Sequence, residues 1–234
     1  MRETICTIPI NDVFGPKEGC PICRLRDMLE HNYVEYITGA AMMEPDVRVE
    51  TNRKGFCRAH FEMMVQSGKR LQNALLLQTH LEQIAREFLS ASPKGKPDKK
   101  QLAALSELQN TCFVCDKIDW GMSHMFETIF HSFENDEAFR TLFEQQESLC
   151  LPHYTALLQG AMGKNGVSSK KLPDFYKASA ALAGGYLKTL GDDVSHFCSM
   201  YDYRSRGGDW KNSKDAIERA VAFLTGRKME SGES

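Results

Sequence analysis

Most of the cysteines in this chain of 234 residues fall into two copies of one pattern. Each copy consists of a C-x2-C pair and a C-x2-H pair, separated by 33 residues in the first copy and 34 in the second. The two copies use six of the eight cysteines. The candidate metal ligands are Cys20, Cys23, Cys57 and His60 in the first copy, and Cys112, Cys115, Cys150 and His153 in the second.

The ligand types in each copy match those of a structural zinc site. Three thiolates and one imidazole complete a tetrahedral Cys3His shell around zinc. A spacing of two residues lets one turn of backbone direct both side chains of a pair at one ion. A single C-x2-C pair could be a redox motif, and unliganded cysteines also pack in protein cores. Two matched copies favour a metal, and we predict two zinc ions per chain.

The spacing favours an arrangement in which each ion is bound within one copy of the pattern. The two spans are nearly equal, as expected if each closes its own loop of helices. Closing a flexible loop of about 35 residues costs about 1 kcal/mol less chain entropy than closing one of about 130. We therefore predict that one ion is shared by Cys20, Cys23, Cys57 and His60, and the other by Cys112, Cys115, Cys150 and His153. A crossed arrangement is the alternative.

Composition and charge indicate a globular protein without a general affinity for nucleic acid or membranes. Hydrophobic residues make up 42% of the chain, charged residues 26%, and the formal net charge is −2. No stretch reaches the roughly 18 apolar residues of a membrane helix, and the N-terminus lacks the apolar core of a signal peptide. We therefore expect a cytoplasmic protein, because thiols stay reduced and free to bind metal in that compartment.

Apolar residues recur at helical spacing along most of the chain, and no stretch alternates as a strand would. We predict an all-α fold, with an internal duplication and a C-terminal helical extension. A helix should begin at each C-x2-C pair, where the helix dipole favours the thiolate. Gly55 should allow the tight turn before Cys57. Residues 1–19 contain two prolines and two glycines and should form an extended lead-in.

The two copies belong to a longer duplication, since Arg48 and Arg140 also lie 92 residues apart. Between the copies, residues 91–100 contain two prolines, one glycine and four lysines, which indicates a solvated linker. We therefore divide the chain into three parts. These are a first metal-binding half at 1–95, a second at 100–165, and C-terminal helices at 170–226 that pack on the halves.

Five stretches of the chain resemble a bacterial family of unknown function, whose members come mostly from anaerobic Firmicutes and carry paired C-x2-C and C-x2-H motifs. The stretches are IPINDVFGPKEGCPICRL, EPDVR, GFCRAH, LCLPH and FCSMYDYRSRGGDW. They extend over nearly the whole chain. The resemblance implies a cytoplasmic bacterial protein with duplicated metal sites, and it implies no activity.

Two features outside the ligands could also carry function. Glu35 and Glu127 lie 92 residues apart, and their carboxylates could form a paired site or accept a hydrogen bond from a ligand histidine, the second role being favoured. The segment 202–210 combines arginine, tyrosine and tryptophan, which are enriched at binding hot spots. The favoured alternative for this segment is a loop between helices, held by an Arg–Asp pair.

The remaining cysteines and histidines form no further ligand set. Cys198 lies on the apolar side of a helical stripe, so we expect a buried core thiol. Cys6 is close to the N-terminus and is expected to be exposed. We expect His80, His124 and His131 at the surface or at an interface.

The sequence contains no nucleophile–base motif and no glycine-rich phosphate loop. Four protein ligands per site leave no open position for a reactive water, which is typical of structural rather than catalytic zinc. We therefore predict a non-catalytic zinc-binding scaffold that binds a protein partner. The alternative is a redox or metal-sensing protein that holds an iron–sulfur cluster or an exchangeable metal. A metal-dependent hydrolase is least favoured, because it would need one ligand to be absent from its site.

Overall fold

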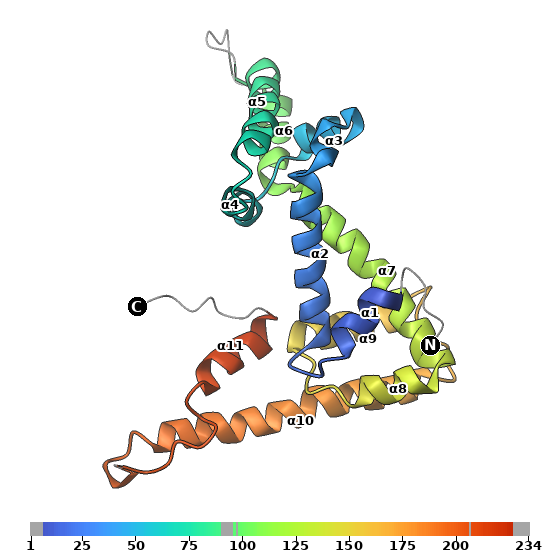
Figure 1. Ribbon diagram of the computed structural model, residues 1–234, viewed down its shortest axis with the longest axis vertical. Helices are drawn as coiled ribbons and strands as arrows, with labels where there is room; N and C mark the ends of the chain where they lie inside the picture. The colour runs from blue at the N-terminus through green and yellow to red at the C-terminus, as the bar shows by residue number, and fades with distance from the viewer. Residues whose placement is uncertain (1–6, 90–95, 97, 206, 227–234) are drawn as a thin grey trace. The chain divides into compact units, whose positions relative to one another are not determined.

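The computed structural model of the chain describes residues 7–89, 96, 98–205 and 207–226, and every regular element within them is a helix (Figure 1). The predicted all-α class is confirmed. None of the described helices combines the length and the apolar character needed to cross a membrane.

The chain forms two compact units. Unit 1 consists of Met1–Arg26 and Ser123–Ser234, and unit 2 of the segment Asp27–Met122. Two helices pass from one unit to the other: α2 (Pro21–Ile37) begins in unit 1 and ends in unit 2, and α7 (Phe113–Asn135) begins in unit 2 and ends in unit 1. Because each of these helices begins at a C-x2-C pair, each unit contains one such pair.

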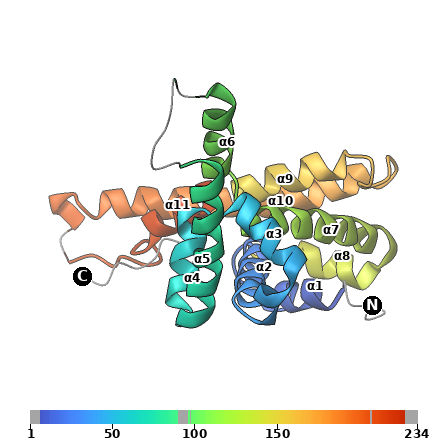
Figure 2. The same ribbon diagram turned by 90° about the horizontal axis from the view of Figure 1, so that it is seen from above.

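The other helices of unit 1 come from both ends of the chain. α10 lies against both α9 and α11 (Figure 2). The helices are α1 (Thr7–Phe14), α8 (Glu137–Glu144), α9 (Leu151–Ala161), α10 (Leu172–Ser199), the 3-10 helix η2 (Tyr203–Ser205) and α11 (Ala216–Thr225).

The core of unit 1 is built largely from phenylalanine rings. Phe143 stands at its centre, with its ring centroid 5.4 Å from those of both Phe133 and Phe175. Phe14 and Phe139 complete the group, and all of these rings are at most 1% exposed. Buried aromatic rings contribute large apolar areas and pair favourably edge to face. This cluster therefore holds α1, α7, α8 and α10 together.

Helix α1 corrects the prediction of an extended lead-in for Thr7–Phe14, and residues 1–6 of that stretch lie outside the described residues. Ile10, Val13 and Phe14 are buried, because a spacing of three to four residues places them on one face of a helix. Pro9 lies in the first turn of α1, where its missing N–H is tolerated. At the other end, Nε of Arg24 donates a hydrogen bond of 2.9 Å to the carbonyl of Val13. Arg24 thus supplies a hydrogen bond to a carbonyl at the end of α1, and the apolar face of the helix packs into the core.

The remaining helices of unit 2 include α4 and α5, which lie side by side (Figures 1 and 2). The helices are the 3-10 helix η1 (Ala40–Met43), α3 (Pro45–Lys54), α4 (Arg58–Gln66), α5 (Arg70–Glu87) and α6 (Lys99–Asn110).

His80 on α5 attaches that helix to α3 within unit 2. Its Nδ1 lies 3.0 Å from the carbonyl oxygen of Asn52, and the adjacent Thr79 hydroxyl donates to Oδ1 of the same residue over 3.1 Å. The His80 side chain is buried, so the expectation that it lies at the surface or an interface is wrong. A histidine is stable there because its polar nitrogen has a backbone partner.

Two sequence predictions fall partly or wholly outside the described residues. Cys6 lies outside them, as do residues 91–95 and 97 of the expected linker. After this segment, Asp98 begins α6 by accepting a hydrogen bond of 3.0 Å from the backbone N–H of Lys100. This is the usual N-cap role of an aspartate.

Candidate metal centres

Four of the eight predicted ligands come together in unit 1 and form site 1: Cys20, Cys23, Cys150 and His153. The Nδ1 atom of His153 lies 3.1 Å from Sγ of Cys150 and 3.3 Å from Sγ of Cys23. The Sγ atoms of Cys23 and Cys150 are 3.6 Å apart. Cys20 and Cys23 flank the start of α2, and Cys150 is the N-cap of α9.

The other four ligands come together in unit 2 and form site 2: Cys57, His60, Cys112 and Cys115. Here Nδ1 of His60 lies 3.1 Å from Sγ of Cys57 and 3.2 Å from Sγ of Cys112. The Sγ atoms of Cys57 and Cys115 are 3.9 Å apart. Cys57 is the N-cap of α4, and the other two cysteines flank the start of α7.

Both clusters have the size of a tetrahedral shell around one ion. Two Zn–S bonds of about 2.3 Å at the tetrahedral angle place their sulfur atoms about 3.8 Å apart. The observed sulfur–sulfur distances are 3.6 Å in site 1 and 3.9 Å in site 2, and the four ligand atoms of each site lie within 4.8 Å of one another. Three sulfurs and one imidazole nitrogen at this separation fit a single thiophilic metal ion.

The predicted grouping of the ligands is wrong, because the two copies of the pattern exchange partners. The first C-x2-C pair meets the second C-x2-H pair in site 1, and the second C-x2-C pair meets the first C-x2-H pair in site 2. The entropy cost of closing a loop depends on its length alone only where the intervening chain is flexible. The 17 residues of α2 instead form a rod of about 25 Å that carries the chain away from Cys23.

The backbone around site 2 supports its ligands through contacts between their two segments. Thr111 Oγ1 donates to the carbonyl of Lys54 over 2.9 Å, and the backbone N–H of Phe113 donates to the carbonyl of Gly55 over 2.9 Å. Gly55 has φ of 61°, and a Cβ there would lie 3.2 Å from the ring of His80. The tight turn predicted at Gly55 is confirmed, since only glycine combines this φ with that close approach.

The equivalent segments of site 1 are joined differently. Gly19, which is 92 residues before Thr111, donates its backbone N–H to the carboxylate of Glu147. Pro21, which is 92 residues before Phe113, has no N–H to donate. The duplication therefore preserves the ligands but not the backbone bond that joins the two segments of site 2.

Helix α11 ends at site 1. The carbonyl oxygen of its C-cap residue, Gly226, lies 3.3 Å from Sγ of Cys23. Gly226 has φ of 71°, and a Cβ at this position would lie 3.5 Å from Sγ of Cys150. The end of α11 therefore contacts the thiol of Cys23, and both the left-handed conformation and the closeness of Cys150 favour glycine there.

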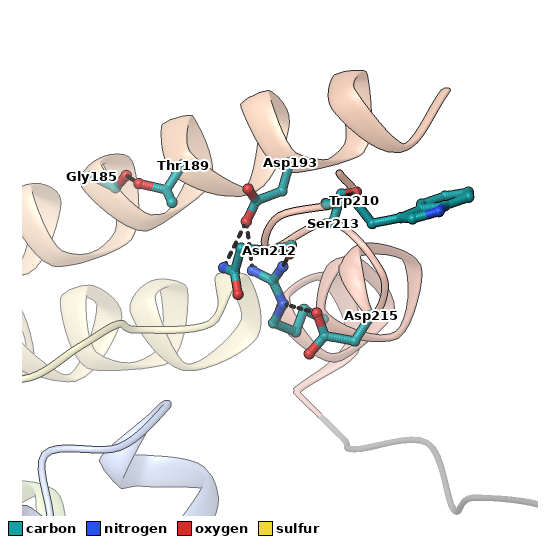
Figure 3. A network of polar contacts seen from close by, with 8 residues as sticks. Gly185, Thr189, Asp193, Trp210, Asn212, Ser213 and Asp215 are labelled. Atoms are coloured by element: carbon teal, nitrogen blue, oxygen red, sulfur yellow. Dashed lines mark hydrogen bonds and ion pairs between the residues drawn. The ribbon is translucent and has the colours of Figure 1, made fainter. Parts of the chain in front are cut away.

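A polar network holds α11 against α10 and the loop before it (Figure 3). Nη1 of Arg219 lies 2.9 Å from a carboxylate oxygen of Asp193, and its Nε lies 2.9 Å from one of Asp215. The same guanidinium donates to the carbonyl of Asn212, whose side chain donates to Asp193 over 3.2 Å. One planar donor group thus joins three segments of unit 1.

Site 2 contains a carboxylate partner for its histidine. Nε2 of His60, the nitrogen that does not face the thiols, lies 3.0 Å from Oε1 of Glu30. The sequence favoured Glu35 and Glu127 for this role, and that prediction is wrong. Both are exposed, and they accept hydrogen bonds of 2.7 Å from Lys69 and Asn165 respectively. No feature of the sequence distinguishes Glu30 from the other carboxylates of α2.

In the metal-free cluster of site 2, burial and the neighbouring thiols set the protonation states. Burial acts to lower the pKa of His60, but hydrogen bonds to Cys112 and Glu30 outweigh it, and the pKa is raised to about 10. Burial acts to raise the pKa of Cys112, but the hydrogen bond to His60 dominates and lowers it to about 6. Burial raises the pKa of Cys115 well above its ordinary value. The hydrogen bond between Cys112 and His60 therefore makes Cys112 easier to deprotonate and His60 harder to deprotonate, whereas Cys115 keeps its proton more strongly.

Site 1 has the same electrostatic character. Burial acts to lower the pKa of His153, but hydrogen bonds to Cys150 and Cys20 raise it to about 9. The hydrogen bond from Cys150 holds the pKa of Cys20 well below its ordinary value, whereas the pKa of Cys23 is raised by hydrogen bonds to Cys150 and Cys20. A bound cation would replace these proton-sharing contacts with direct bonds to all three sulfurs.

The other candidates from the sequence remain separate from the two sites. Cys198 is exposed, so the expectation of a buried core thiol is wrong. His124 and His131 are exposed, as expected. In the segment 202–210, residue 206 lies outside the described residues, and the ring of Trp210 packs 5.9 Å from that of the exposed Tyr201, which precedes the segment.

Comparison with protein families shows a match to the model of DUF6062, a family of unknown function, over residues 1–231. Comparison with curated proteins and with solved structures gives no match. The family match spans the ligands of both sites, and it confirms the family resemblance predicted from the sequence.

Proposed function

Because the chain belongs to DUF6062, a family whose function is unknown, we propose its role from the geometry of the two clusters. Each cluster is a structural Cys3His zinc site, and the protein is a non-catalytic helical scaffold that binds a protein partner. The observation that carries this proposal is the closed ligand set. Each site gathers four protein ligand atoms within 4.8 Å of one another, which leaves no position for a metal-bound water.

The close spacing favours zinc over an iron–sulfur cluster. In a cluster, thiolates bind different irons and are held further apart than ligands that share one ion. The thiols of these sites are separated by 3.6 Å in site 1 and 3.9 Å in site 2, as expected for one ion. Three soft sulfur ligands and one imidazole also suit zinc better than magnesium or calcium, which prefer oxygen.

Structural zinc would serve a clear purpose in this fold. Each site joins the start of one helix to the start of another that is distant in the sequence, α2 to α9 in unit 1 and α7 to α4 in unit 2. The six ligand thiols have to stay reduced to bind metal, which supports placing the protein in the cytoplasm. The family resemblance supports a bacterial source.

The aromatic group at the end of α10 supports a role in binding protein. Tyr201 and Tyr203 are 74% and 79% exposed, and the rings of Phe197 and Trp210 pack 5.5 Å apart beside Tyr201. Tyrosine and tryptophan are enriched at interaction hot spots because they bury large areas with few rotamers. This group has no place in either metal site, so it is available to a partner.

Metal analysis of protein purified without oxygen tests the proposal. We expect about two zinc ions per chain, a colourless solution, and an X-ray absorption spectrum that fits three sulfurs and one nitrogen per zinc. Iron with sulfide and visible absorption bands would instead establish the redox or sensor alternative. An oxygen ligand in the zinc shell would contradict a purely structural role.

A further inference from the structure

The two metal sites have the same types of ligand, but within the described residues only the histidine of site 2 has a carboxylate partner. Both histidines direct Nδ1 at their thiols, which leaves Nε2 facing away from the site. In site 2, the side chain of His60 is 2% exposed, and its Nε2 lies 3.0 Å from Oε1 of Glu30. In site 1, Nε2 of His153 has no hydrogen-bond partner within the described part of the chain.

The internal repeat explains the difference between the sites. Positions on α2 and α7 correspond with an offset of 92 residues, as Cys20 and Cys112 do. The residue that corresponds to Glu30 is Met122, whose thioether cannot replace a carboxylate as a hydrogen-bond acceptor. The sequence thus repeats the ligands and omits the acceptor from the second copy. The two sites are equivalent in their ligands but not in what supports them.

We propose that Glu30 is a positioning residue that makes the two metal sites inequivalent. By accepting the Nε2 proton of His60, the carboxylate fixes the tautomer in which the Nδ1 lone pair is free to bind metal, and it holds the ring plane toward the thiols. Histidine ligands are commonly oriented in this way, and loss of such a partner lowers metal affinity roughly 10- to 100-fold. Occupancy of site 2 therefore depends on Glu30, whereas occupancy of site 1 does not.

The position of Glu30 supports a directed role rather than a chance contact. Its side chain is 18% exposed, so the carboxylate is held close to the protein instead of extending into water. Glu35, on the same helix, provides a comparison: its side chain is 47% exposed and pairs with Lys69. A carboxylate that is partly buried needs hydrogen-bond donors, and the ring nitrogen Nε2 of His60, 3.0 Å away, is one of them.

The test rests on the proposed zinc sites and uses the full-length, zinc-loaded chain. Glu30→Ala removes the acceptor, Glu30→Gln keeps an oxygen acceptor without the charge, and Glu35→Gln is the matched control on the same helix. Competition with a chromophoric zinc chelator measures the affinity of each of the two sites. Nitrogen-detected NMR of the histidine rings reports whether His60 keeps its proton on Nε2. Thermal unfolding in excess zinc checks that each variant is folded.

We expect Glu30→Ala to lower the affinity of one site roughly 10- to 100-fold and leave the other unchanged. Glu30→Gln should have a smaller effect on the same site, and Glu35→Gln should have none. The NMR signals of His60, not those of His153, should change in the Glu30→Ala variant. A wild-type chain with two zinc ions and unchanged affinities in both Glu30 variants would overturn the role of Glu30 alone. A wild-type chain that binds no zinc would overturn this inference together with the proposed function.

Discussion

The Sγ atom of Cys23 lies 3.6 Å from the Sγ atom of Cys150, although 127 residues separate them along the chain. All the ligands of site 2 lie within this interval, between residues 57 and 115. The loop closed by site 2 is therefore nested inside the loop closed by site 1. Two copies of one motif therefore form two nested closures rather than one closure within each copy.

The exchange of partners predicts which pairs of cysteine substitutions act together. In the double variant Cys23→Ser/Cys150→Ser both changes remove a ligand from site 1, so one zinc should remain bound. In Cys23→Ser/Cys57→Ser each site loses one ligand, so both ions should be lost or bound weakly. Native mass spectrometry would count the ions. Grouping of the ligands within each copy would give one remaining zinc in the second variant and none in the first.

Unit 2 should bind one metal ion on its own. A fragment of residues 27–122 contains all four ligands of site 2 and Glu30, and no ligand of site 1. We expect it to fold on addition of one equivalent of zinc, measured as a gain of helical circular dichroism, because metal binding drives folding in small domains. The same fragment with Cys112→Ser should stay unfolded. Zinc-independent helicity in both fragments would contradict this expectation.

All eight residues of the two clusters could be identified from the sequence as candidate ligands, because ligand chemistry fixes both the residue types and the spacing within each pair. Which pairs share an ion could not be predicted. A C-x2-C pair binds equally well with either C-x2-H pair, so the choice depends on where α2 and α7 lead the chain. The 33 residues after Cys23 suggested a closed loop, but more than a third of them lie in the stiff helix α2.

The repeat also predicted the wrong carboxylate as the hydrogen-bond partner of a ligand histidine. Glu35 and Glu127 recur at the same offset, whereas the residue that contacts His60 is Glu30, which is not repeated. Symmetry in a sequence identifies what both copies need, such as the ligands. It conceals what only one copy has. The prediction that Cys198 is buried failed for a different reason. The apolar stripe of α10 continues to the end of the helix, whereas the buried residues of this helix end at Leu190.

Removal of metal should destabilise the whole chain. Each site joins the starts of two helices, and without an ion the thiols of each cluster contact one another only through weak hydrogen bonds. We expect a strong chelator to lower the thermal midpoint by roughly 10 °C or more and to reduce the helical signal. Restoring two equivalents of zinc should reverse both changes. An unchanged melting curve after verified metal loss would show that the sites are peripheral to stability.

Zinc affinity should rise steeply with pH. At neutral pH the metal-free site 2 keeps a proton on His60, whose pKa is about 10, and one on Cys115, whose pKa is raised. Zinc has to displace both protons, so affinity increases as pH rises toward 10 and falls as pH drops. Displacing at least these two protons per ion corresponds to a change in affinity of roughly a hundredfold or more per pH unit. Chelator competition at several pH values would measure the slope, and a slope near zero would contradict these protonation states.

The last prediction concerns the helix that ends at site 1. Arg219 binds Asp193, Asp215 and the carbonyl of Asn212, and its side chain is only 21% exposed. Replacing it with alanine should cost about 2 kcal/mol, because the Asp193 carboxylate would lose its charged partner in a largely buried place. The end of α11 would then separate more often from Cys23. We therefore expect faster hydrogen exchange in α11 and faster release of one zinc ion.

The matched control for Arg219→Ala is Arg58→Ala. Arg58 also pairs with a carboxylate four residues away, but its side chain is 92% exposed, and it follows a ligand of site 2 directly. Its removal should change neither release rate, because an exposed pair of this kind contributes little to stability. Arg219→Lys should fall between alanine and wild type, since lysine keeps the charge but cannot bind three acceptors in one plane. Equal zinc release from wild type and Arg219→Ala would show that α11 does not protect site 1.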